Sequence, residues 1–236
     1  MIFEQLVPTQ DNDLTPIQIP ELKEILLPGQ ICKSWRDAAI ATPALWSSLQ
    51  FNFNNPKNIV ERMVDMATTC IARAKSYPLF IYFKTWYPDL TRYRPIIAVL
   101  LAHSNQWHNL FIDSMGFQGS AHEELQDAKG RLPMLCRLKV DYGHIEEWGS
   151  CDTFLTLPNL RILDLCNYGF QPWHQIGQFP PLPWRQLQQI AFMGQALDAL
   201  ELLRMSPSLQ VFEVCVVGRS EGLHHVHHTF LRELSV

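Results

Sequence analysis

The sequence predicts an α/β protein in which short parallel strands, one from each copy of a repeated motif, form a single sheet with helices between them. Three observations support this fold class. The motif L-x-x-L-x-L, clearest in residues 160–165, places apolar residues at three fixed positions, and five other segments repeat that placement. The last two positions alternate with their neighbours at period two, as in a strand with one buried face. Helix-compatible segments lie between the motifs.

The motif recurs at a regular distance. Its first positions are residues 107, 135, 160, 187, 209 and 231, which are 28, 25, 27, 22 and 22 residues apart. These distances match the roughly 20 to 29 residues of leucine-rich repeats. The six copies are Trp107/Leu110/Ile112, Leu135/Leu138/Val140, Leu160/Leu163/Leu165, Leu187/Ile190/Phe192, Leu209/Phe212/Val214 and Leu231/Leu234/Val236. Two weaker copies precede them, Trp46/Leu49/Phe51 and Tyr77/Phe80/Tyr82. An ordinary α/β domain with Leu-rich strands is the alternative that the pattern leaves open.

Three segments between the motifs favour helices: residues 95–104, 121–129 and 196–205. Leu197, Leu200 and Leu203 share one helical face before Pro207 ends the last of these. Residues 169–184 contain four prolines, which favour a loop over a helix or an inner strand. The Asn that usually follows each strand of a leucine-rich repeat is missing from most copies. The predicted solenoid is therefore irregular.

The amino-acid composition of the chain argues against several classes of protein. With 236 residues, 47% of them hydrophobic, the chain can bury a sizeable core. A net charge of -4 argues against a nucleic-acid partner, which Lys and Arg must neutralise. The six cysteines form no C-x-x-C pair, so neither a zinc site nor a disulfide framework is indicated. The sequence contains no secretory signal and no apolar run long enough to span a membrane, which favours the cytoplasm or the nucleus.

Near the N-terminus, residues 29–41 predict one amphipathic helix. Ile31, Trp35 and Ala38 or Ala39 recur at three- and four-residue spacing, and Pro43 ends the helix. Such an apolar stripe is expected to pack against another element.

These residues also carry a family resemblance. The segment ICKSWRDAA (31–39), followed by TPALWSSL (42–49), resembles the second half of a fungal-type F-box. The rest of the chain is similar to the degenerate leucine-rich repeats of that family, in segments such as LPML (132–135) and LPNL (157–160). The resemblance divides the chain into an incomplete F-box-like helical segment, 1–55, and an irregular repeat domain, 56–236. The motif ending at Val236 lacks a capping unit, which suggests a shortened repeat domain.

The resemblance implies the substrate-recognition subunit of a cullin-RING ubiquitin ligase, which binds a Skp-type adaptor on the cullin scaffold and presents a protein target without being an enzyme. It implies neither a cofactor nor a membrane or nucleic-acid partner. The adaptor-binding residues it implies are Ile31, Cys32, Trp35, Arg36, Ala39, Pro43, Leu45 and Trp46. However, IPEL (19–22) alone echoes the first half of the box. The alternative is therefore a non-catalytic interaction scaffold that has lost adaptor binding.

The predicted target-binding surface is the sheet face opposite the buried positions, because side chains alternate along each strand and solenoids commonly bind partners on such a face. Its candidate residues are Asn109, Phe111, Asp113, Arg137, Lys139, Asp141, Ile162, Asp164, Gln189, Ala191, Met193, Val211 and Glu213.

Other chemistries are weaker predictions. The cluster 224–228 (HHVHH) could suggest a metal site, but it lacks the Glu of an H-E-x-x-H motif, and a turn between repeats explains it as well. Cys166 with His144 or His174 could form a nucleophilic pair only if the fold brought them together. The aromatic segment 84–88 could bind a ligand or form a loop.

Overall fold

The structure is a computed structural model that describes residues 28–54, 59–85, 91–114, 124–141, 152–166, 179, 181–216 and 232–235. Within these residues eight strands form one sheet, and each strand pairs in parallel with the next strand in the sequence. The strands are β1 (Ser48–Asn52), β2 (Leu79–Thr85), β3 (Trp107–Ser114), β4 (Arg137–Asp141), β5 (Ile162–Cys166), β6 (Gln189–Gly194), β7 (Val211–Val216) and β8 (Glu233–Ser235). The predicted α/β class and its parallel sheet are confirmed.

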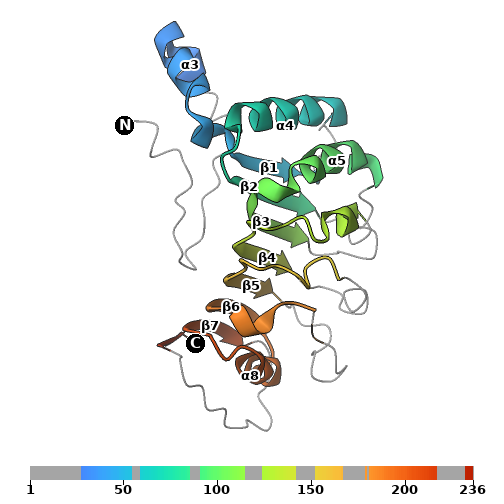
Figure 1. The fold of residues 1–236 in the computed structure, drawn as a ribbon, viewed down its shortest axis with the longest axis vertical. Helices are drawn as coiled ribbons and strands as arrows, with labels where there is room; N and C mark the ends of the chain where they lie inside the picture. The colour runs from blue at the N-terminus through green and yellow to red at the C-terminus, as the bar shows by residue number, and fades with distance from the viewer. Residues whose placement is uncertain are drawn as a thin grey trace.

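Helices and 3₁₀ turns connect the strands, since a parallel pair needs a crossover between its members. The α-helices are α2 (Pro28–Ile31), α3 (Lys33–Ile40), α4 (Val60–Ala74), α5 (Arg94–Ala102) and α8 (Ala196–Met205). The 3₁₀ turns are η2 (Pro43–Trp46), η3 (Thr91–Tyr93), η4 (Ser104–Gln106), η5 (Gln126–Ala128) and η7 (Trp184–Gln186). Figure 1 shows the strands stacked in sequence order, with α4 and α5 beside the sheet and α3 standing apart from it.

The motif positions form the core in rows that run across the sheet. The strand register aligns the second motif positions of all the strands except β2, where Ile81 takes that place, and each side chain of the row in β1 to β7 is at most 1% exposed. This row consists of Leu49, Ile81, Leu110, Leu138, Leu163, Ile190 and Phe212. The third motif position forms a parallel row two residues further along each strand, from Phe51 in β1 to Phe192 in β6. Both rows belong to one continuous hydrophobic core with the helices.

In strand β2 the residues in the core rows differ from those that the motif predicted. The sequence suggested Tyr77, Phe80 and Tyr82 as its buried positions, but Ile81 and Phe83 align with the core rows instead. Phe80 is buried as expected, at 0% exposed, but its neighbour across the sheet is Asn109 on the opposite face. Residues 79–83 are apolar or aromatic throughout, so alternation alone does not decide which set faces the helices, and a one-residue slip reverses the two faces.

Helix α4 was not predicted. Its buried residues Met63, Ala67, Cys70 and Ile71 follow helical spacing, and Glu61 near its start and Arg73 near its end complement the helix dipole. Helix α8 matches its predicted range, and α5 covers most of residues 95–104. Of the third predicted helix, 121–129, residues 124–128 are helical and end in the 3₁₀ turn η5, while residues 121–123 lie outside the described residues. Most of the predicted loop 169–184 lies outside the described residues.

The predicted N-terminal helix is interrupted. Cys32 has extended backbone angles (φ -157°, ψ 172°) and separates α2 from α3. The domain boundary predicted at residue 55 also does not divide the sheet, because β1 pairs with β2 and both contribute to the same core. None of the helices in the described ranges is long and apolar enough to cross a membrane.

Candidate functional site

The predicted target-binding residues lie in three rows on the second face of the sheet, the face opposite the core rows. One row joins Asn109, Arg137, Ile162, Gln189 and Val211. The next joins Phe111, Lys139, Asp164, Ala191 and Glu213, and the third contains Asp113, Asp141 and Met193. The structure therefore brings all thirteen predicted residues onto one surface, as side-chain alternation along parallel strands requires. Of Asp141, only the position in β4 is described.

A buried ion pair holds the centre of this face. The Nη2 of Arg137 donates to Oδ2 of Asp164 at 2.8 Å, and Nε donates to the same oxygen at 3.2 Å. The two side chains are 4% and 10% exposed. The guanidinium carbon of Arg137 also lies 5.5 Å from the ring centre of Phe111, which is 5% exposed. These three predicted contact residues are mostly occupied with one another, so their main role is to support the face.

A second polar cluster lies beside the pair, on β2 and β3. The hydroxyl of Tyr82 donates to Oδ2 of Asp113 at 2.8 Å, and Nζ of Lys84 lies 3.9 Å from the same oxygen. The rings of Tyr82 and Phe111 are tilted, with their centres 6.4 Å apart. All of these side chains except Phe111 are partly exposed. Sequence reasoning missed Tyr82 because it assigned that residue to the core; the register of the flanking strands is the signal that would have corrected it.

Strands β6 and β7 carry the more accessible half of the face. Gln189, Ala191, Met193, Val211 and Glu213 are all partly exposed. Most of this surface is apolar or small, with one carboxylate. Surfaces of mixed apolar and polar character suit a protein partner.

Two further predicted contact residues, besides Arg137, Asp164 and Phe111, have buried side chains. Asn109 is 3% exposed, and its Oδ1 lies 2.7 Å from Nδ1 of His108, in a hydrogen bond whose direction depends on the His tautomer. Ile162 is also 3% exposed. Both therefore stabilise the face and offer little area to a partner.

The eight residues predicted to bind the adaptor divide into two groups. Ile31 is 62% exposed, Cys32 and Arg36 are exposed, and Trp35 and Pro43 are partly exposed. By contrast, the remaining three belong to the core; they are Ala39, Leu45 and Trp46, at 2%, 1% and 3% exposed. The structure places the first group on the surface and the second inside the molecule.

Trp46 fixes the end of α3 to the rest of the molecule. Its Nε1 donates to the carbonyl oxygen of Ala39 at 2.8 Å, and the Arg73 guanidinium of α4 lies 4.2 Å from its ring centre. Helix α3 therefore has a fixed attachment at its C-terminal end, although the rest of the helix stands apart from the sheet (Figure 1).

Two of the described cysteines, Cys70 and Cys136, lie in surroundings that disfavour the reactive thiolate. Burial raises the pKa of the Cys70 thiol to about 11, which the nearby Arg73 only partly offsets. Burial likewise raises the pKa of Cys136. A raised pKa keeps the thiol neutral and unreactive at neutral pH. Of the predicted nucleophilic pair, the side chain of Cys166 and both histidines lie outside the described residues.

The described ranges contain no group of three or more His, Cys, Asp or Glu side chains arranged to hold a metal ion. The His cluster at 224–228 lies outside these ranges, as do residues 86–88 of the aromatic segment.

Comparison of the chain with protein-family models, with curated proteins and with solved structures gives no match.

Proposed function

We propose that the chain is the substrate-recognition subunit of a cullin-RING ubiquitin ligase, with an F-box-like N-terminal segment and a solenoid of leucine-rich repeats. The observation that carries the proposal is the presence of two separate surfaces on one rigid core. One is the exposed side of α2 and α3, and the other is the second face of the sheet. A recognition subunit needs such a pair, because it must hold an adaptor and a target at the same time.

Exposed apolar side chains support the adaptor surface. Ile31 is 62% exposed and Ile40 is 42% exposed, and both lie on the helical segment that stands apart from the sheet (Figure 1). Large apolar side chains gathered on a surface often mark an interaction site. Burying the exposed part of each one in an interface would contribute less than the roughly 1.5–3 kcal/mol of a fully exposed side chain, and less for Ile40 than for Ile31.

The strand order supports the target surface. One strand per motif, each parallel to the next, is the arrangement that stacked leucine-rich repeats produce. In such a solenoid the rows of side chains on the second face form a continuous surface, and the accessible part over β6 and β7 is the proposed target site.

Co-purification tests the adaptor half of the proposal. The full chain is co-expressed with the Skp-type adaptor of its source organism, and the Ile31→Asp variant is compared with Leu155→Asp. Leu155 is the matched control because it is 51% exposed and lies away from α2 and α3. The adaptor should co-purify with the wild type and with Leu155→Asp but not with Ile31→Asp, while all three keep the same melting temperature. Absence of the adaptor from the wild-type preparation would overturn the proposal.

A scaffold without adaptor binding is the second candidate. The burial of Leu45 and Trp46 favours it, because neither side chain can contact an adaptor while it belongs to the core. This candidate predicts that a target binds the second face without recruiting a cullin. If the wild type captures a target and the captured complex contains no adaptor although the adaptor was present, the scaffold is favoured over the ligase.

Under either candidate the chain performs no catalysis itself. The ligase proposal assigns ubiquitin transfer to other subunits and locates the protein in the cytoplasm or nucleus.

A further inference from the structure

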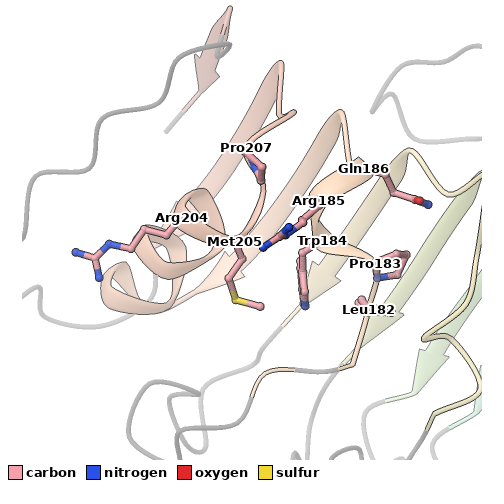
Figure 2. Close-up of a pocket in the computed structure, with 8 residues that line it drawn as sticks. All are labelled: Leu182, Pro183, Trp184, Arg185, Gln186, Arg204, Met205 and Pro207. Carbon is pink, nitrogen blue, oxygen red and sulfur yellow. The ribbon is translucent and has the colours of Figure 1, made fainter.

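Two segments that each lead into a strand line an open surface cavity of about 740 Å³. Residues 182–186 precede β6, and residues 204–207 connect α8 to β7. The volume lies within the roughly 300–1,000 Å³ of typical ligand pockets. Figure 2 shows the side chains of Trp184 and Met205 pointing in the same direction, with Arg204 extending away from them at one side.

The cavity is lined mainly by apolar side chains. Leu182 and Trp184 are 6% and 7% exposed, and Met205 and Pro183 are partly buried beside them. An indole ring and a thioether both favour contact with an aromatic ring. This lining suits an aromatic side chain.

The charged groups of the lining are both cationic. Arg185 and Arg204 are exposed, and none of the described lining residues carries a carboxylate. Arg204 lies 3.1 Å from Glu201, whereas Arg185 has no ion-pair partner among the described side chains. Because the chain as a whole carries a net charge of -4, this local positive charge does not reflect its composition. Guanidinium groups bind carboxylates in two-pronged hydrogen bonds.

Backbone hydrogen bonds hold the walls in place. In η7 the Gln186 N–H donates to the Pro183 carbonyl and the Leu187 N–H to that of Trp184, both at 3.2 Å. The Ser206 N–H donates to the Leu202 carbonyl at 3.1 Å. The Gln186 side chain is itself bonded to the backbone carbonyls of Leu157 and Leu160. Walls that are already ordered lower the entropic cost of binding.

We propose that this cavity binds an acidic peptide segment, with an aromatic side chain against Trp184 and Met205 and a neighbouring carboxylate on Arg185. The site lies apart from the second face of the sheet and does not depend on the ligase function. It would be a second recognition site for a protein partner.

Fluorescence anisotropy on the full chain tests the proposal, with the labelled peptide Asp-Glu-Phe-Asp-Glu as the probe. We expect saturable binding that weakens as salt is added, since the Arg contacts are exposed to screening. Replacing Phe by Ala in the peptide should weaken binding about tenfold, and Arg185→Glu should do the same, each equivalent to about 1.4 kcal/mol. Arg62→Glu is the matched control, because Arg62 is an exposed Arg on α4 outside the cavity. It should leave the affinity unchanged.

A second variant separates binding from folding. Met205→Gln keeps a similar volume but removes the apolar contact, so it should reduce the preference for Phe over Ala without changing the melting temperature. The proposal is overturned if binding of the peptide probe does not saturate when the concentration of the protein reaches about 1 mM, which would mean a dissociation constant weaker than about 1 mM. It is equally overturned if Lys-Lys-Phe-Lys-Lys binds as well as the acidic probe, or if Arg62→Glu weakens binding as much as Arg185→Glu.

Discussion

Arg137 and Asp164 pair with each other on the second face of the sheet, where the sequence predicted both residues to lie without revealing that they pair. Their assignment to the second face follows from side-chain alternation, which is fixed at period two in any strand. Their pairing does not follow, because it joins residues 27 positions apart and depends on the register of β4 and β5. The pair is buried, so its charges stabilise the face and contribute less to contact with a partner.

The buried pair gives the first prediction. Asp164→Ala removes the carboxylate that accepts both hydrogen bonds described for the buried Arg137 guanidinium, which should lower the free energy of unfolding by up to about 3–5 kcal/mol. The double variant Arg137→Met with Asp164→Leu removes both charges and should recover most of this loss. Urea denaturation measures both effects.

The exposed pair of Lys129 and Asp152 is the control for this experiment. These side chains are 56% and 44% exposed, so Asp152→Ala should lower the free energy of unfolding by at most about 1 kcal/mol. Equal losses in Asp164→Ala and Asp152→Ala would contradict the structural role of the buried pair.

Cys70 gives a prediction about pH. Its pKa is raised from 9.0 to about 11 by burial, so between these values the unfolded chain loses the thiol proton while the folded chain keeps it. The free energy of unfolding should therefore fall as pH rises above 9, by about 1.4 kcal/mol per pH unit from this group, and not change with its titration below 9. Urea denaturation at pH 8 and pH 10 should show a smaller fall for Cys70→Ala than for the wild type. Cys32→Ala, which alters an exposed thiol, should behave like the wild type.

At the scale of elements, regular repetition was predictable and irregular segments were not. The six strong motifs position β3 to β8 because each repeats the same apolar spacing. The register of β2 was missed because its two faces are similarly apolar. Helix α4 was not predicted because two of its buried residues, Ala67 and Ala74, are small and make its apolar stripe weak in the sequence.

Helix α4 gives a prediction on packing. Ala67 is fully buried, so Ala67→Leu forces additional methyl groups into a filled core and should lower the free energy of unfolding by about 1–3 kcal/mol. Ala72 lies on the exposed side of the same helix, and Ala72→Leu should change stability by less than about 0.5 kcal/mol. Thermal or urea unfolding distinguishes the two; a similar result for both would contradict the assigned orientation of α4.

At the scale of the whole molecule, the hydrophobic core extends across the domain boundary at residue 55 that the family resemblance suggested. Residues on both sides of position 55 pack together, since η2 and β1 contribute buried side chains to the core shared with α4 and β2. A motif identifies where a family's segment ends in the sequence. It does not indicate which side chains complete the neighbouring core, because that depends on contacts between elements.

The shared core predicts the behaviour of a fragment. Residues 56–236 alone would lose Leu45, Trp46, Leu49, Phe51 and Phe53, each of which contributes about 1.5–3 kcal/mol by burial. The sum is comparable with the roughly 5–15 kcal/mol stability of a typical domain. We expect the fragment to show no cooperative thermal transition by circular dichroism. A fragment with the melting temperature of the full chain would restore the boundary at 55.

The proposal that one surface holds an adaptor while another remains available for a target is tested most directly by calorimetric titration of the full chain with the Skp-type adaptor of its source organism. The account predicts a saturable one-to-one complex whose affinity is lost in Ile31→Asp and unchanged in Lys139→Glu and Glu213→Lys, which alter only the second face. Absence of binding by the wild type, or loss of binding in the second-face variants, would contradict it.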